Sequence, residues 1–99
     1  MKIYSNTVSG SYRHTANFIY NVQSFSYQLA WDGNLNGIVQ LEASLDGDKW
    51  HLVPGSQQST AGVPGSHLID VSSASYMQVR PAYDHVSGTG VLTIDYYYK

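Results

Sequence analysis

The feature that most constrains this chain is an alternation of apolar and polar side chains in two runs, residues 24–31 and 37–45. In SFSYQLAW, residues 24–31, every second side chain is large and apolar, and GIVQLEASL, residues 37–45, repeats the pattern. A period of two is typical of a β-strand with one buried face. No window of eleven or more residues has a helical period. The sequence therefore predicts an all-β chain.

The spacing of the turn residues predicts how such strands are arranged. Runs rich in Tyr, Val, Ile and Thr are separated by turn residues every eight to twelve positions, as in β-sandwiches. With 99 residues, we expect a single domain, 1–99, because cores of this size do not divide. We predict an antiparallel two-sheet β-sandwich, jelly-roll-like, with about seven or eight strands. The expected strands are residues 3–8, 17–22, 24–31, 37–45, 50–53, 66–71, 76–83 and 91–98.

The connections between these runs carry more specific predictions. DGNLNG, residues 32–37, is expected to close a hairpin between the strands on either side. Residues 54–65 contain two Pro-Gly pairs and are expected to form a loop. Pro81 indicates an edge strand, or a strand that ends nearby, because proline cannot donate to a neighbouring strand. Residues 1–17, polar from Ser5 onward, are either a flexible tail or an arm that docks on a neighbouring subunit.

The composition excludes several classes of function. The formal charge is −2, so no basic excess is available to bind nucleic acid. Charged residues make up only 12%, and thirteen Ser, six Gln and five Asn take their place, which suits a surface partly covered by partners. The chain has no Cys, which excludes disulfides and thiolate metal sites. We found no apolar leader and no run of 18 apolar residues, so we expect synthesis in a cytoplasm and no membrane insertion.

The turn that follows residue 44 raises the question of why a tryptophan comes directly after it. Asp46 is expected to accept backbone N–H groups across the turn, and Gly47 or Asp48 to supply a positive φ. Trp50 would then enter the core where the two sheets close, and would bury on the order of 200 Å² of aromatic surface. At about 25 cal/mol per Å², this burial stabilises the fold by several kcal/mol. We therefore interpret Trp31, Asp46, Gly47 and Trp50 mainly as structural anchors.

The same residues resemble known β-sandwiches. Ser44-x-Asp46-Gly47-x-x-Trp50 is similar to the S-x-D-G-x-x-W hairpin of discoidin-like (factor 5/8 type C) domains, and SYMQVRPAY, residues 75–83, resembles the RYVRI strand that follows it. Together with a hairpin expected at SGTG-V-L-T, residues 87–93, and the tryptophan hairpin from Trp31 to Gly37, this pair is similar to small β-sandwich proteins of bacteriophage virions. The resemblance covers roughly residues 23 to 96. Discoidin domains are about half as long again, and their ligand-binding spikes have no counterpart in this chain.

The resemblance to virion proteins implies a function. It implies a non-enzymatic structural component of a bacteriophage virion: a capsid, vertex or tail accessory or decoration protein. The expected partners are other copies of the chain and a larger capsid or tail protein, and the expected location is the virion, after synthesis in a host cytoplasm. Few charges and exposed aromatic residues agree with such a role. We expect no enzyme activity, because no nucleophile elbow and no phosphate-binding loop is present.

Two sets of side chains are candidate metal ligands, and both match a metal site only weakly. Asp32-x-Asn34-x-Asn36-Gly37 matches the first half of a calcium loop, but residue 43, where the bidentate Glu belongs, is Ala. A hairpin loop is the favoured interpretation, and a weak calcium site of another kind stays as the alternative. The four histidines share no metal-ligand spacing; they are His14, His51, His67 and His85. We therefore predict no metal and no cofactor.

The C-terminal tyrosines are the candidate interface or ligand platform. Strand alternation should point Tyr96 and Tyr98 one way and Tyr97 the other, so at least one of them faces out of the sandwich. Exposed tyrosines anchor protein interfaces or stack on sugars. The alternative function is therefore a carbohydrate-binding, host-attachment module that binds a cell-surface glycan through Tyr97, Trp31 or residues 54–65. The plain alternative, in which two of the tyrosines fill the core and one is an ordinary surface residue, carries equal weight.

Overall fold

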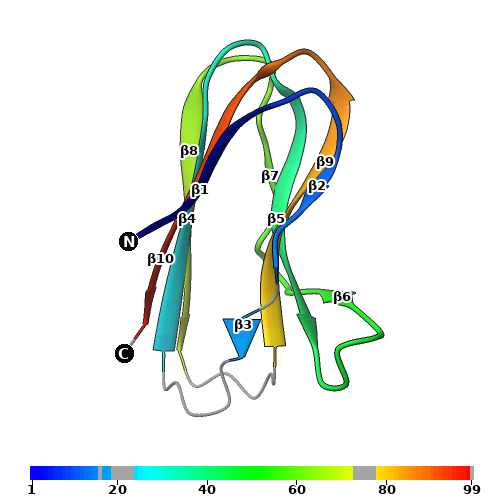
Figure 1. The fold of residues 1–99 in the computed structure, drawn as a ribbon, viewed down its shortest axis with the longest axis vertical. Coiled ribbons are helices and arrows are strands. Elements are labelled where there is room, and N and C mark those ends of the chain that lie inside the picture. Colours follow the sequence, from blue (N-terminus) through cyan, green and yellow to red (C-terminus); the bar gives the residue numbers. More distant parts are fainter. Residues whose placement is uncertain (16, 19–23, 73–77, 99) are drawn as a thin grey trace.

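The protein is a sandwich of two antiparallel β-sheets packed face to face (Figure 1). The computed structural model describes residues 1–15, 17–18, 24–72 and 78–98. Within these ranges the chain forms strands, turns and bends, and no helix there could cross a membrane. The prediction of an all-β, antiparallel two-sheet sandwich is therefore confirmed.

The described residues form ten strands, and six of them have seven residues or more. The two sheets have the strand orders β1-β10-β4-β8, which we call sheet A, and β2-β9-β5-β6, which we call sheet B. In sheet B, β3 also pairs with β9, and β7 with β5. The strands are β1 (Lys2–Val8), β2 (Tyr12–Arg13), β3 (Asn17–Phe18), β4 (Ser24–Trp31), β5 (Asn36–Ser44), β6 (His51–Leu52), β7 (Gln58–Ser59), β8 (Gly65–Ser72), β9 (Gln78–Ser87) and β10 (Gly90–Tyr98).

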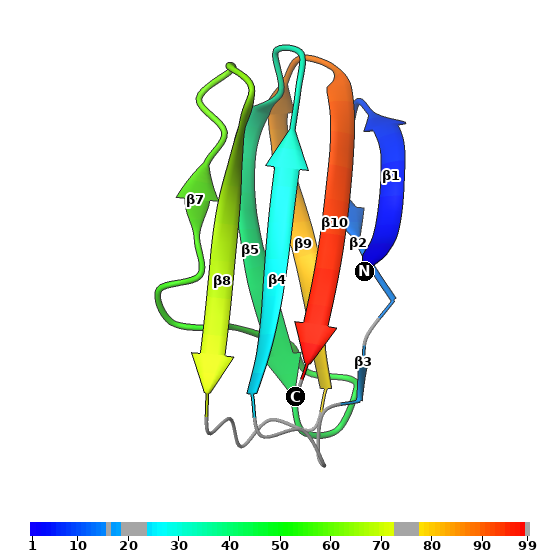
Figure 2. The same cartoon turned by 90° about the vertical axis from the view of Figure 1, so that its left-hand side faces the viewer.

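The order of the strands is that of a jelly roll. Because β2 and β3 both pair with β9, and β6 and β7 both pair with β5, the ten strands occupy eight positions, four in each sheet. The chain crosses between the sheets after β1, β3, β4, β7, β8 and β9 (Figures 1 and 2). This is the double-sheet topology in which strands from distant parts of the sequence become neighbours.

The core consists of the inward faces of the long strands, as the alternation predicts. In β4 the four apolar side chains are at most 7% exposed, and in β10 Leu92 and Ile94 are fully buried. Tyr27 of β4 packs against Tyr96 of β10, with 4.7 Å between the ring centroids. Sheet B contributes Val39, Leu41 and Tyr83, which are also fully buried.

Two expected hairpins are instead crossings between the sheets. β4 lies in sheet A and β5 in sheet B, so the prediction that residues 32–37 close a hairpin is wrong. The same holds for residues 87–93, because β9 lies in sheet B and β10 in sheet A. Leu35 explains the first crossing: it is completely buried, and so fills the space between the sheets at that end. Alternation identifies strands but does not say whether the next strand lies beside them or opposite them.

The prediction for Pro81 is also wrong. Pro81 lies inside β9, a central strand of sheet B, opposite Leu41 of β5. Its carbonyl accepts the backbone N–H of His14, so its nitrogen also points toward the β2 side, because both groups of a strand residue point the same way. There it faces the interval between the end of β2 at Arg13 and the start of β3 at Asn17. Leu41, its partner in β5, bonds through its N–H and its carbonyl to Ser56 and Val53 on the other side, so Pro81 removes no hydrogen bond between β9 and β5. Proline is therefore tolerated in this strand.

The N-terminal segment is part of the sandwich. β1 pairs with β10 along Lys2–Val8, and β2 pairs with β9. The expectation of a flexible or docking arm over residues 1–17 is therefore corrected for the described residues. Tyr4 on β1 stacks on Tyr12 on β2, with ring centroids 4.3 Å apart, and this contact closes one open flank of the sandwich.

Residues 54–65 form the expected loop, except for the short β7, and two buried hydroxyls fix it to β5. The Ser56 Oγ accepts the backbone N–H of Leu41 at 3.1 Å. Thr60 Oγ1 donates to the Leu35 carbonyl at 2.6 Å and accepts the Gly37 N–H at 3.0 Å. Both side chains are 1% exposed, so buried hydrogen bonds attach the loop to the sandwich at two points.

Candidate functional site

The C-terminal tyrosines alternate in the way the strand period predicts. Tyr96 is 7% exposed and belongs to the core, whereas Tyr97 is 66% exposed on the outer face of sheet A. Tyr98 returns to the side of Tyr96 and stacks on it, with 5.6 Å between centroids, but it is at the end of the strand and remains half-exposed. Of the three, Tyr97 is the ring that points directly away from the core.

Tyr97 belongs to an apolar patch on sheet A that also contains Met1 and Leu68; we call it the outer-face patch. The three side chains are 73%, 66% and 64% exposed for Met1, Tyr97 and Leu68. They line a shallow depression of about 120 Å³ together with polar groups of Ser26, Gln28 and Asp95. The patch joins the N-terminus, β8 and β10, which the sheet order brings together from opposite ends of the sequence.

The rest of the outer face of sheet A is flat and poor in charge. Outward-facing residues of neighbouring strands form rows such as Thr93–Ala30–Ser66, in the register of β10, β4 and β8. The next two rows are Asp95–Gln28–Leu68 and Tyr97–Ser26–Asp70. The charged side chains that the structure describes on this face are Lys2 and Asp95, which are opposite each other in the register, and Asp70, whose carboxylate accepts a hydrogen bond from Ser26 Oγ. Most of the face therefore consists of hydroxyls and apolar groups.

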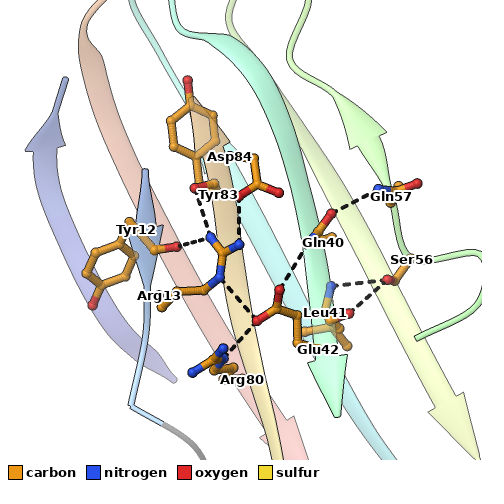
Figure 3. Close-up of polar contacts among 10 residues, drawn as sticks. All are labelled: Tyr12, Arg13, Gln40, Leu41, Glu42, Ser56, Gln57, Arg80, Tyr83 and Asp84. Atoms are coloured by element: carbon orange, nitrogen blue, oxygen red, sulfur yellow. Dashed lines mark hydrogen bonds and ion pairs between the residues drawn. The ribbon is translucent and has the colours of Figure 1, made fainter. Parts of the chain in front are cut away.

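The outer face of sheet B differs in character, because it holds both arginines and the only glutamate of the chain, and ion pairs join its charged groups into one network. Glu42 Oε1 forms an ion pair with the Nε of Arg13 at 3.1 Å and accepts a hydrogen bond from the Nε of Arg80 at 2.8 Å (Figure 3). Arg13 Nη2 also donates to Asp84 Oδ1 at 2.7 Å, and its Nη1 donates to the carbonyls of Tyr12 and Tyr83. We call Arg13, Glu42, Arg80 and Asp84 the charged cluster.

Uncharged side chains extend the charged cluster toward the loop. Gln40 Nε2 donates to the second oxygen of Glu42 at 3.3 Å, and Gln57 Nε2 donates to Gln40 Oε1 at 3.0 Å (Figure 3). No buried side-chain nitrogen or oxygen in the described part of the chain lacks a hydrogen-bond partner. The cluster satisfies its own groups and has the properties of a structural element that faces solvent.

Trp50 is located beside this cluster and outside the core, which differs from the role we expected for it. The guanidinium carbon of Arg80 is 4.1 Å from the centroid of the Trp50 ring, and the side chain is only half-buried. Trp31 is the buried tryptophan, at 7% exposure, and its Nε1 donates to the Val63 carbonyl at 2.8 Å. Burial also removes Trp31 as a sugar-stacking residue.

The turn before Trp50 has the geometry predicted for Asp46 and Gly47. Asp46 Oδ1 accepts the backbone N–H groups of Asp48 and Lys49 at 2.8 and 2.9 Å, and the Ser44 hydroxyl at 3.0 Å. These bonds, those from Lys49 and Asp48 first, lower the pKa of Asp46 from 3.8 to about 2. Gly47 has φ 78°, a conformation that costs glycine little. The turn joins β5 to β6 as a true hairpin.

The side chains that suggested a calcium loop bind backbone groups instead. Asp32 Oδ1 accepts the N–H of Val91 at 2.7 Å, and Asn34 Oδ1 accepts the N–H of Thr89 at 3.0 Å. Both bonds tie the crossing after β4 to the crossing after β9. Residues 32–36 therefore hold the two crossings together, and these hydrogen bonds give Asp32 and Asn34 a structural role.

The histidines are dispersed over the fold. His14 Nδ1 is 2.7 Å from the hydroxyl of Tyr12, and His85 Nδ1 is 2.9 Å from the hydroxyl of Tyr83. Burial lowers the pKa of His14 below 6.5. His67 Nε2 is 3.2 Å from the Ser56 carbonyl. No group of three or more potential metal ligands occurs among the residues that the structure describes.

Sequence reasoning missed the charged cluster. Its members lie at positions 13, 42, 80 and 84, and only the pairing of β2 and β5 with β9 brings them together. The available signal was that Glu42 and Arg80 occupy the polar face of their strands. Without the strand order, this signal does not identify the partners.

No protein-family model matches the chain, and no curated protein matches its sequence. The function is therefore argued from the two outer faces themselves.

Proposed function

We propose that this protein is a non-enzymatic structural component of a bacteriophage virion, a capsid, vertex or tail accessory protein that docks through the outer face of sheet A. The observation that supports it most is the contrast between the two faces. The charged cluster is on sheet B, whereas the face of sheet A has the outer-face patch, rows of hydroxyls and few charges. Interfaces are depleted in charge and enriched in Tyr and Met at their centre.

The proposed partners are a larger capsid or tail protein and other copies of the chain. In this role Tyr97, Leu68 and Met1 would be buried on docking, and the surrounding Ser, Thr and Gln side chains would complete hydrogen bonds at the rim. The resemblance of residues 44–50 and 75–83 to virion β-sandwiches supports the location in a virion. Jelly rolls serve in viral capsids, but also in lectins, so the topology by itself does not decide the function.

The test is to purify particles of the phage that encodes the chain and to identify the chain in them by mass spectrometry and immunogold labelling. A double substitution, Leu68→Ser with Tyr97→Ser, should abolish incorporation into particles. The matched control is Leu45→Ser with Val86→Ser, two side chains that are equally exposed, at 70% and 72%, but are outside the patch. The absence of the chain from purified particles, or equal incorporation of both double variants, would refute the proposal.

A second candidate function, glycan binding for host attachment, is favoured by one specific observation. The exposed ring of Tyr97 borders a depression whose other walls include Gln28, Ser26 and Asp95, and this combination of a flat ring and hydrogen-bonding groups suits a sugar. A glycan array with the wild-type chain and Tyr97→Ala tests it. Binding of a defined glycan that is lost in the variant would support this function in place of, or beside, docking.

A further inference from the structure

The strand β1 forms an open edge of sheet A. Sheet A ends in β1 on one side and β8 on the other. In Figure 2, β7 and the loop that contains it extend past β8, whereas β1 is the outermost strand on its own side, and in Figure 1 that side faces the viewer. Natural proteins protect such edges with charges, prolines or short strands. β1 has seven residues and carries neither charge nor proline from residue 3 to residue 8.

The hydrogen bonds of β10 show which backbone groups of β1 are free. Val91 bonds with Asp32 through both its N–H and its carbonyl, so it faces β4, and the alternate residues Leu92 and Ile94 face β1. Their partners in the register are Asn6 and Tyr4. The backbone groups of Ser5 and Thr7 consequently point away from β10, to the open edge.

A second observation agrees with this assignment. The N–H of Thr7 donates to Oδ1 of its own neighbour Asn6 at 2.9 Å, and not to β10. The Thr7 N–H lies at the open edge, where another strand could accept it, and in this structure it is bonded to the exposed side chain of Asn6. Such a local bond is easily exchanged for a carbonyl of an incoming strand.

We propose that a second copy of this chain pairs with β1 in antiparallel fashion, across a two-fold axis at Asn6. This register places Ser5 of each copy opposite Thr7 of the other, so that the outward-facing groups of both residues form four backbone hydrogen bonds. A register centred on Ser5 or on Thr7 gives only one such pair within the regular part of the strand, Tyr4–Val8, because a bulge interrupts β1 at residue 3. The inference goes beyond the proposed function, since this edge is a different surface from the outer-face patch.

The side chains match in the same register. On the outer face Ser5 meets Thr7 of the second copy, which extends the hydroxyl row that Ser5 already forms with Thr93 at 3.1 Å. On the inner face Tyr4 meets the second copy's Val8, both in contact with the apolar core. No charge opposes a like charge. The two four-stranded sheets would become one eight-stranded sheet with a continuous, charge-poor outer face.

The size of this contact predicts a weak dimer. One strand pair buries less than the roughly 1,000 Å² expected of a stable interface, so the association should depend on concentration. Within a particle, where the chain is held at high local concentration, the same contact would be repeated and strengthened.

Single cysteines test the register, because the chain has none of its own. In Asn6→Cys the two introduced thiols face each other across the two-fold axis, with Cα atoms about 4.5 Å apart, which a disulfide can bridge. We expect N6C to form a disulfide dimer at least tenfold faster than Ser66→Cys, a control on the outer face of the edge strand β8. A mixture of Ser5→Cys and Thr7→Cys should form a heterodimer, although each of these variants alone should form little dimer.

Light scattering of the wild-type chain over a concentration series gives the complementary measurement. The average mass should rise toward that of a dimer, and Ser5→Lys with Thr7→Lys should keep it at that of a monomer. Equal disulfide formation by N6C and S66C, with no heterodimer in the mixture, would overturn the proposal. If the double substitution of Leu68 and Tyr97 abolishes incorporation into particles but leaves β1 pairing intact, the two proposals are shown to be independent of each other.

Discussion

The guanidinium carbon of Arg80 lies 4.1 Å from the centre of the Trp50 ring, while the Nε of the same arginine donates to Glu42 at 2.8 Å. A tryptophan just after a tight turn thus packs on the outer surface of sheet B, covered on one face by a cation that a carboxylate fixes in place. It stabilises the joining of β5, β6 and β9, but it does not fill the space between the sheets.

This location predicts a moderate cost for removing the Trp50 ring. We expect Trp50→Ala to lower the free energy of unfolding by about 2 kcal/mol, the value of a cation–π contact between two partly buried groups. Trp31→Ala should cost about 3–5 kcal/mol, because that ring is in the core. Urea unfolding of both variants measures the difference. Equal losses would mean that Trp50 is a core anchor.

Glu42 should be the most sensitive member of the charged cluster. Its side chain is 13% exposed, and it forms ion pairs with both arginines. Glu42→Gln removes the charge, which leaves the partly buried guanidinium of Arg80 without its carboxylate and leaves Arg13 paired with Asp84 alone. We therefore expect a loss of about 2 kcal/mol in the free energy of unfolding. Asp84→Asn is the matched control: its side chain is 47% exposed, and the expected loss is about 0.5 kcal/mol or less. A larger effect of the Asp84 substitution would contradict this ranking.

The low pKa of Asp46 is a direct consequence of the turn. Because its folded pKa of about 2 is below the usual 3.8, the unfolded chain takes up the proton first on acidification. The stability that this carboxylate contributes is present above pH 3.8 and is lost as the pH falls toward 2. An NMR titration should give a pKa of about 2 in the wild-type chain and a higher pKa in Ser44→Ala, which lacks one hydrogen bond. Ser66→Ala, on the other sheet, should leave the pKa unchanged.

His14 predicts a second pH dependence, at higher pH. Burial lowers its folded pKa below 6.5, so the fold favours the neutral ring, which lies against Tyr12 and Tyr4. The unfolded chain therefore binds more protons below pH 6.5, and stability decreases as the pH falls through 6.5 toward the folded value. Thermal unfolding at pH 7.5 and at pH 5.5 should show a smaller difference in Tm for His14→Gln than for the wild-type chain. The same difference in both proteins would assign the effect to another group.

The sequence was sufficient for features that depend on a single strand or a single turn. Alternation located β4, β5 and β10 within about one residue, and the Asp46-Gly47 pair predicted its turn, because these signals are local. It was not sufficient for features that depend on which strands are neighbours. The crossing at Leu35, the central position of Pro81 and the charged cluster all follow from the jelly-roll order, which no local pattern encodes. The position of Trp50 on the outer surface has the same cause.

The close approach of β5 and β9 at Gly37 gives the sharpest test of that strand order. A Cβ at Gly37 would lie 2.2 Å from the Asp84 carbonyl oxygen and 2.8 Å from Cε1 of Tyr83, and the first of these is backbone that cannot move without breaking the sheet. We expect Gly37→Ala to cost at least about 3 kcal/mol in the free energy of unfolding. Gly10→Ala, where no atom lies within 4 Å of the added carbon, should change stability by less than about 1 kcal/mol. Chemical denaturation of the pair decides the matter, since a tolerated Gly37→Ala would mean that β5 and β9 do not approach each other in this register.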